Sequence, residues 1–231
     1  MTLKKSLNLI KKSSFGINNY FGMLRSRGIR LVIEYFFFNH LFDIIHGTDT
    51  HSWEFNQKNS KFSDSEIYMV TWTKDIIDST QKLEHLSKIK NFSESNFIDI
   101  GSGKGKVLLV WRKLFPENKN IFGIEYDKNF IKITESNFQK MNYEKVNLLL
   151  GDISSLKVKR IKKDKKTIFF LFNPCGEKTL KNFFKINKIL NSYIIYFNPV
   201  HAKLIENYGY VEIFSKVSYR NGSTYKLFAR S

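Results

Sequence analysis

Cysteine, proline and long apolar runs are all scarce in this sequence of 231 residues. Its single cysteine, Cys175, excludes an intramolecular disulfide and any metal site built from several cysteines. Only three prolines occur and no proline- or serine-rich linker divides the chain, so the length fits one α/β domain with an N-terminal extension. The most apolar stretch, residues 29–45, contains charged and polar side chains and does not predict a membrane-spanning helix.

Metal-binding and targeting patterns are also lacking. The five histidines are scattered without a spacing such as H-E-x-x-H, so no metal is expected. The first residues are basic, but no long apolar run or small-residue cleavage site follows them, and a signal peptide is not predicted. We therefore expect a cytoplasmic protein, with peripheral attachment to a membrane as a further option.

Acidic residues are few beside basic ones. The chain has 38 Lys and Arg against 21 Asp and Glu, a net charge of +17, and residues 1–40 alone carry seven basic residues against one acidic residue. A field of this sign attracts polyanions such as nucleic acid, acidic glycans or anionic membrane surfaces. An AT-rich coding sequence also produces a chain rich in Lys, Asn, Ile and Phe, so a polyanionic partner and compositional bias both explain the charge.

Apolar and aromatic residues, by contrast, are plentiful at 42% and 16%, enough for a folded core. Residues 1–62 predict a basic helical extension and residues 63–231 the main domain. Apolar residues at helical spacing over 30–45 favour a helix packed on that domain, with docking on an anionic membrane surface as the alternative. Residues 63–89 predict a second helix, begun by a capping box at 63–66.

From Asn96 onward, apolar strands alternate with helices, a pattern typical of a parallel sheet covered on both faces. The expected strands are residues 97–100, 121–125, 146–150, 167–172 and 192–197, and the expected helices are residues 104–115, 129–141, 178–190 and 201–208. Two last strands, residues 210–219 and 223–229, flank an Asn-Gly pair that is typical of a hairpin turn. We therefore expect a Rossmann-like α/β fold, with a seven-stranded, mostly parallel sheet that ends in an antiparallel hairpin.

A glycine-rich turn follows the first of these strands. The strand ends in Asp99, and the chain then turns through Gly101, Gly103 and Gly105 into a helix. Glycine permits a positive φ and lets a ligand approach the backbone closely. Such a ligand lies outside the carboxyl ends of parallel strands, where open α/β sheets bind their cofactors.

The next three strands each end in a polar group suited to the same ligand. Glu125 ends the second strand, 20 residues after the last glycine, where an acid can accept hydrogen bonds from both ribose hydroxyls. Asp152 follows the third strand and is placed to accept a hydrogen bond from an adenine amino group. Asn173 follows the fourth, and residues 173–176 are expected to line the same pocket. The structural alternatives are helix capping for the two acids, local backbone contacts for Asn173 and passive packing for Cys175.

These segments resemble the class I S-adenosylmethionine-dependent methyltransferases over roughly residues 95–230. The resemblance implies S-adenosylmethionine (SAM) as cofactor, with Asp99 orienting its methionine amino group, Glu125 on ribose and Asp152 on adenine. The cofactor residues so implied are Asp99, Gly101, Ser102, Gly103, Gly105, Glu125, Asp152, Ile153, Asn173, Tyr68 and Thr71.

A narrower likeness is to a bacterial subgroup with a G-x-D-T element before the domain and N-P-F-G after strand four. This chain has Gly-Thr-Asp-Thr at 47–50 and Asn-Pro-Cys-Gly at 173–176, so cysteine replaces the aromatic residue. The pocket candidates implied by this likeness are Asp49, Thr50, Pro174 and Cys175. The turn D-x-G-S-G-x-G is also similar to that of the non-SET histone-lysine methyltransferases, whose preceding loop resembles residues 68–71.

The sequence therefore predicts methyl transfer to an unidentified oxygen or nitrogen acceptor, with a sugar or other small molecule favoured and a protein lysine next. No catalytic residue is identified, although His46 and His51 flank Asp49 and either could act as a base. An NAD-dependent dehydrogenase is one alternative, but its glycine spacing is G-x-G-x-x-G and not the G-x-G-x-G found here. The other is a non-catalytic, methyltransferase-like module that binds nucleic acid or a membrane surface through the basic extension.

Overall fold

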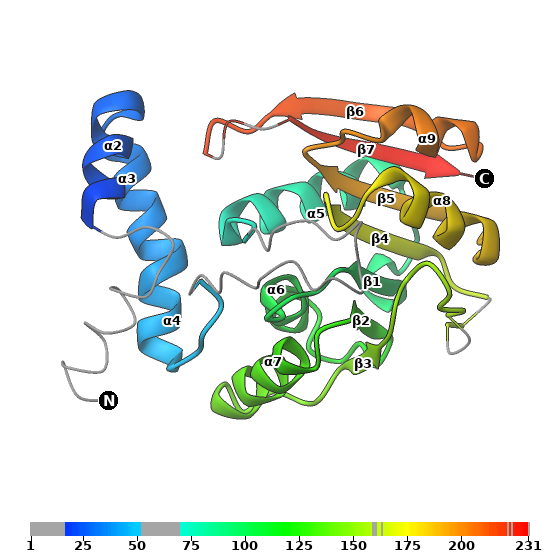
Figure 1. The fold of residues 1–231 in the computed structure, drawn as a ribbon, viewed down its shortest axis with the longest axis horizontal. Helices are drawn as coiled ribbons and strands as arrows, with labels where there is room; N and C mark the ends of the chain where they lie inside the picture. The colour runs from blue at the N-terminus through cyan, green and yellow to red at the C-terminus, as the bar shows by residue number, and fades with distance from the viewer. Residues whose placement is uncertain are drawn as a thin grey trace.

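The fold is a single sheet covered by helices on both faces (Figure 1). The computed structural model describes residues 17–51, 70–158, 161–162, 164–220, 222 and 224–230. The strands are β1 (Asn96–Ile100), β2 (Ile121–Glu125), β3 (Asn147–Leu150), β4 (Thr167–Phe172), β5 (Ser192–Phe197), β6 (Val211–Val217) and β7 (Thr224–Arg230). The helical segments are α2 (Ile17–Arg27), α3 (Ile29–Tyr35), η1 (Phe36–His40, a π-helix), α4 (Leu41–His46), α5 (Thr73–Ser87), η2 (Phe92–Glu94, a 3₁₀-helix), α6 (Lys106–Leu114), α7 (Lys128–Lys140), α8 (Glu177–Ile186) and α9 (Ala202–Asn207).

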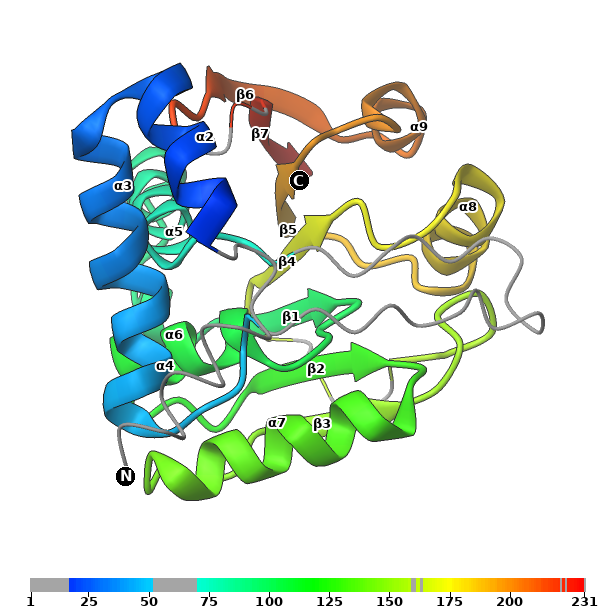
Figure 2. The same cartoon turned by 60° about the vertical axis from the view of Figure 1, so that its left-hand side comes forward.

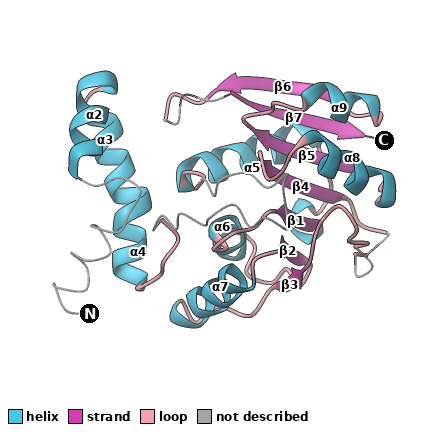
Figure 3. Cartoon of the chain, in the orientation of Figure 1, coloured by secondary structure: helices cyan, strands magenta, loops and turns pink. Residues whose placement is uncertain are grey.

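The strand order is β3-β2-β1-β4-β5-β7-β6, which confirms the predicted seven-stranded, mostly parallel sheet with an antiparallel hairpin (Figure 3). β1 pairs in parallel with β2 and β4, and β4 in parallel with β5. β7 is inserted antiparallel between β5 and β6. Because β1 to β5 all run the same way, their carboxyl ends meet at one edge of the sheet, where such folds bind their ligands.

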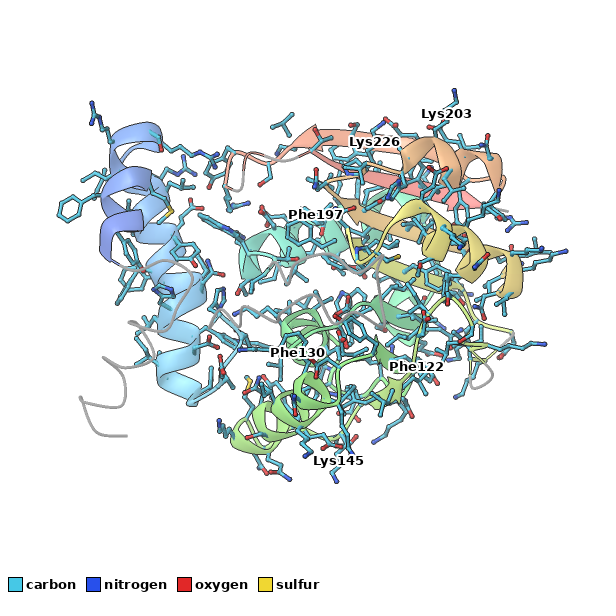
Figure 4. The ribbon with its side chains drawn as sticks, in the orientation of Figure 1. Phe122, Phe130, Lys145, Phe197, Lys203 and Lys226 are labelled. Atoms are coloured by element: carbon cyan, nitrogen blue, oxygen red, sulfur yellow. The ribbon has the colours of Figure 1, made fainter. Side chains whose placement is uncertain are left out.

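Two apolar layers hold the helices to the sheet. On one face α5, α6 and α7 pack on it, and Trp111 of α6 is completely buried and donates a hydrogen bond from Nε1 to Thr80 Oγ1 at 3.1 Å. On the other face α8 and α9 contribute Leu180 and Ile205. Phe197, at the end of β5, is buried in the first layer (Figure 4). Full burial of each such side chain stabilises the fold by about 1.5–3 kcal/mol.

Residues 17–51 form a helical arm that lies alongside α5 and α6 (Figure 2). The helix predicted over 30–45 is confirmed, with the π-helical turn η1 in its middle. Arg220, in the turn between β6 and β7, fixes the arm to the domain, because its Nε lies 3.0 Å from Glu34 and its Nη1 lies 2.9 Å from Asp75. No helix among the described residues is long and apolar enough to cross a membrane.

Two predicted helices have different bounds from those expected. A continuous helix over 63–89 is wrong, because Trp72 has an extended backbone and α5 begins at Thr73; the predicted capping box lies outside the described residues. The free N–H of Thr73 is satisfied instead by Asn39 Oδ1 of the arm, at 3.1 Å. The helix predicted over 178–190 ends at Ile186, because Asn187 turns its side-chain amide to the carbonyls of Leu156 and Phe183.

Candidate active site

The glycine turn joins the ends of three strands. Gly101, Gly103 and Gly105 all have positive φ, of 75°, 51° and 80°. A Cβ on Gly101 would lie 2.7 Å from Cβ of Pro174, in the turn after β4, so only glycine fits this position. The turn is fixed to β2 by the N–H groups of Gly101 and Ser102, which both donate to the carbonyl of Ile124 at 2.9 Å.

Glu125 stabilises this arrangement through its carboxylate. Oε2 accepts a hydrogen bond from the N–H of Gly103 at 2.8 Å, and Oε1 accepts from the N–H groups of Tyr126 and Asp127 at 2.9 Å. Burial nevertheless raises the pKa of Glu125, since three N–H donors only partly compensate for the loss of water. The side chain predicted to bind ribose thus also fixes the glycine turn to the end of β2.

Asp99 provides a second buried carboxylate at the same edge. Burial, and then the negative charge of Glu125, raise the pKa of Asp99 well above its usual value. A ligand ammonium group beside Asp99 would reverse that shift, because an opposite charge favours the ionised form. The amino group of a bound amino-acid moiety fits this requirement.

Two buried polar atoms at this edge lack a hydrogen-bond partner within the described part of the chain. They are Ser102 Oγ in the glycine turn and Asn173 Oδ1 in the turn after β4. Buried polar groups are nearly always hydrogen-bonded, so Asn173 Oδ1 at the strand ends is available to a polar ligand, whereas Ser102 Oγ faces inward, 2.9 Å from where a Cβ on Gly123 of β2 would lie. The buried carboxylates, the glycine turn and Asn173 Oδ1 together fit the amino-acid and ribose groups of SAM.

Asp152 has a local structural role as well. Its Oδ1 accepts a hydrogen bond from the N–H of Ser154 at 2.8 Å, which caps the turn after β3, and the neighbouring Ile153 is buried in the second apolar layer. Its contact with adenine stays a prediction. Thr71 is buried directly before α5, and its cofactor role is likewise untested. Tyr68 lies outside the described residues.

The second of two Asn-Pro turns was missed in the sequence. Asn173 and Asn198 follow β4 and β5, which are in register at Phe172 and Phe197. Both asparagines have left-handed backbones, with φ of 44° and 48°. The repeated triplet Phe-Asn-Pro, at 172–174 and 197–199, was a visible signal, and parallel pairing of the two strands brings the triplets to the same edge.

The other pocket candidates lie around the glycine turn. Asp49 forms an ion pair with Lys104 of that turn, and Thr50 accepts a hydrogen bond from Lys106. Cys175 is buried in the second apolar layer. His51 is buried beside Asp43, and burial lowers its pKa to about 4. No group of three or more His, Cys, Asp or Glu side chains in the described ranges is arranged to hold a metal ion.

The class of protein follows from four features together. Asp99 lies near the end of β1, a glycine turn follows it, Glu125 ends the adjacent strand β2, and the sheet finishes in an antiparallel hairpin, as in class I methyltransferases. The chain matches the family model described as "Methyltransferase domain" over residues 91–216, more than half of its length, and belongs to that family. S-adenosylmethionine is accordingly its cofactor, which decides against a nicotinamide-dependent dehydrogenase.

Among curated proteins, the chain is 34% identical over 67 residues to a probable cobalt-precorrin-6B C(15)-methyltransferase (decarboxylating) of Sulfurisphaera tokodaii. That match covers 29% of this chain and 35% of the relative, so it spans only about a third of the relative's length.

Solved structures show the same fold at low identity. A putative RNA methyltransferase from Pyrococcus horikoshii is 15% identical with a TM-score of 0.51, covering 81% of this chain and 93% of that one. TrmK of M. capricolum, in complex with S-adenosylhomocysteine, is 14% identical with a TM-score of 0.50, covering 71% and 69%.

Proposed function

We propose that this methyltransferase acts on a hydroxyl or amine of a small molecule or sugar, with a protein lysine as the second acceptor class. The unpartnered Oδ1 of Asn173 is the observation that supports this. It belongs to the turn whose Pro174 contacts Gly101 of the glycine turn, so it lies beside the predicted methionine end of the cofactor. A buried amide oxygen is suited to accept the hydrogen of an acceptor O–H or N–H group.

The side chains then divide the work between positioning the cofactor and orienting the acceptor. When bound, SAM supplies a methyl group activated by its sulfonium centre, and the acceptor atom displaces the thioether and loses a proton. Asp99 holds the cofactor's ammonium group and Glu125 holds its ribose, while the glycine turn lets the cofactor approach the backbone closely. Asn173 orients the acceptor, and such alignment is the main contribution that a protein makes to a transfer of this kind.

An acceptor screen tests the proposal. Sugars, small amines and lysine peptides are incubated with SAM labelled in its methyl group, and released S-adenosylhomocysteine and labelled product are both measured. Mass and magnetic-resonance analysis of the product identifies the methylated atom. The curated relatives are named for methylation at a carbon, so a carbon-methylated product would overturn the proposed acceptor class.

Asparagine-to-glycine variants test the role of Asn173 without straining its left-handed backbone. We expect Asn173→Gly to lower kcat about 2- to 13-fold, as expected for the loss of an orienting neutral hydrogen bond of about 0.5–1.5 kcal/mol, while cofactor affinity changes little. Asn191→Gly is the matched control, since Asn191 has φ of 52° but precedes β5, at the opposite edge of the sheet. Full activity in Asn173→Gly would contradict the assignment.

We also propose that the helical arm docks the enzyme on an anionic lipid surface. Ile29, Ile33 and Phe37 are exposed and repeat every four residues along the arm, so they form one apolar stripe, and Ile45 is exposed further along the arm. Arg25 and Arg30 are exposed nearby. None of the three carboxylates among described residues 17–51 (Glu34, Asp43 and Asp49) is exposed, so the charge of this face favours anionic headgroups.

Sedimentation with phosphatidylcholine vesicles, with and without phosphatidylserine, tests the docking. We expect salt-sensitive binding only to the anionic vesicles, and its loss in the double variant Ile33→Ser, Phe37→Ser. Val217→Ser is the control, because Val217 is equally exposed on the edge strand β6. Absence of binding by the wild-type chain refutes the docking, and so does a wild-type dimer that the double variant abolishes, since the stripe then joins two copies.

A further inference from the structure

Two lysines of the glycine turn are buried, which is uncommon for this residue type. Lys104 is completely buried and Lys106 is 3% exposed. A buried ammonium group destabilises a fold unless it is paired or hydrogen-bonded. Among the described residues, Lys104 pairs with Asp49 and Lys106 bonds to Thr50, both in the short segment 47–51, which ends the helical arm and is here named the anchor loop.

Lys104 has partners at both its side chain and its backbone. Its Nζ lies 3.2 and 3.3 Å from the two carboxylate oxygens of Asp49. Its carbonyl accepts a hydrogen bond from Asn137 Nδ2 at 3.1 Å, and the same Nδ2 donates to the carbonyl of Asp49. Asn137 Oδ1 in turn accepts from the N–H of Asp49 at 2.9 Å. Asp49 and the glycine turn are therefore joined both by an ion pair and through one shared asparagine of α7.

Lys106 is attached to the next residue of the anchor loop. Its Nζ donates to Thr50 Oγ1 at 3.1 Å and lies 4.2 Å from the ring centroid of Phe42. Thr50 in turn donates through its N–H and its hydroxyl to the buried carboxylate of Asp43. Burial by itself raises the pKa of Asp43, but hydrogen bonding from His51 and the charge of Lys106 hold it below its usual value. Buried hydrogen bonds and charges therefore tie the anchor loop to the domain at Thr50 and Asp43.

Lys104, which the anchor loop holds, is one residue away from the groups expected to face the cofactor. Lys104 follows Gly103, whose N–H donates to Glu125 and whose carbonyl accepts from Thr134 Oγ1 at 3.1 Å. A shift of the Lys104 backbone therefore moves the N–H that orients Glu125. Catalytic and binding groups lose effectiveness with displacements of about 1 Å, so what holds Lys104 also sets the geometry at Glu125.

We propose that Asp49 is a positioning residue for the cofactor: through Lys104 it holds the glycine turn in the conformation that binds SAM. This rests on the proposed cofactor roles of Glu125 and the glycine turn. It gives the G-x-D-T element a specific task, distinct from lining the acceptor pocket. It also makes the helical arm part of the cofactor site, although Asp49 lies 55 residues before the lysine that it holds.

Calorimetric titration with S-adenosylhomocysteine tests the proposal on the full chain. We expect Asp49→Asn and Lys104→Met each to weaken binding about tenfold, and the double variant to be no weaker than either single one, because both remove the same interaction. Glu144→Gln is the matched control: it removes one charge from an exposed ion pair with Lys119, outside both the helical arm and the glycine turn. Its affinity should equal that of the wild type.

Stability and local dynamics separate positioning from simple loss of structure. Near-UV circular dichroism identifies the temperature range in which each variant is folded, and amide hydrogen exchange is measured there. We expect Asp49→Asn to speed exchange at Gly103 while the amides of β4 and β5 keep wild-type protection. Asp49→Glu keeps the charge and serves as a second variant if Asp49→Asn does not fold; its affinity should lie between those of wild type and Lys104→Met.

The outcomes distinguish this proposal from the proposed function. Wild-type affinity in folded Asp49→Asn, or equal weakening in Asp49→Asn and Glu144→Gln, overturns the positioning role. Should Asp49→Asn not fold, wild-type affinity in Lys104→Met overturns it as well. Failure of the wild-type chain itself to bind S-adenosylhomocysteine overturns the cofactor site and the function built on it.

Discussion

Replacing Glu125 with glutamine removes one charge while keeping the shape of the side chain. Its carboxylate accepts three backbone hydrogen bonds, one on Oε2 from Gly103 and two on Oε1 from Tyr126 and Asp127. A glutamine amide offers an oxygen on one side only, so its NH₂ group must face at least one backbone N–H. A buried donor left unsatisfied costs about 1–3 kcal/mol. Relief of the repulsion with Asp99 offsets part of this, so we expect the free energy of unfolding to fall by about 1–2 kcal/mol.

The effect on the cofactor should be larger than the effect on stability. Glu125 would lose the charge-assisted hydrogen bonds that we predict it makes to ribose, and the N–H of Gly103 would lose the partner that aligns the turn. Hydrogen bonds to charged groups contribute about 1.5–3 kcal/mol each, so affinity for S-adenosylhomocysteine should fall roughly 10- to 100-fold. Titration calorimetry measures the affinity, and thermal unfolding with and without ligand measures the stability.

Glu144→Gln is the control for Glu125→Gln, since it removes the same charge from an exposed residue that pairs with Lys119. A folded Glu125→Gln variant that binds S-adenosylhomocysteine as tightly as Glu144→Gln would refute the assignment of Glu125 to the cofactor.

Three further predictions concern charge, space and the helical arm. Because the pKa of Asp99 is raised in the fold, the unliganded protein should lose stability as pH rises through that pKa, while SAM affinity increases over the same range; Asp99→Asn should flatten both curves in titrations across pH, and unchanged curves would contradict this. Gly101→Ala should abolish SAM binding measured by calorimetry, since its Cβ would lie 2.7 Å from Cβ of Pro174 on a left-handed backbone; retained affinity would show that the turn relaxes freely. Arg220→Ala should lower the free energy of unfolding by about 3 kcal/mol in denaturant titrations, because it leaves the buried carboxylate of Asp75 without its cation; a change below about 1 kcal/mol would show that the pair is dispensable.

Local residue patterns were enough to predict the sheet, the cofactor turn and the family. Apolar strands of four to seven residues, the glycine spacing after Asp99 and the Asn-Gly hairpin each express preferences of neighbouring residues, and all lead to the same fold. The positions of Glu125 and Asn173 follow from this, because parallel strands necessarily bring their carboxyl ends to one edge.

What the tertiary structure decided depends on groups far apart in the chain. The start of α5 is set by Asn39, 34 residues earlier, and not by a local capping box. Lys104 and Lys106 look like solvated lysines in the sequence, yet both are buried because the anchor loop supplies Asp49 and Thr50. A lysine can be buried only where a partner pairs with its ammonium group. Here that pairing forms only when two segments distant in the sequence meet in the fold.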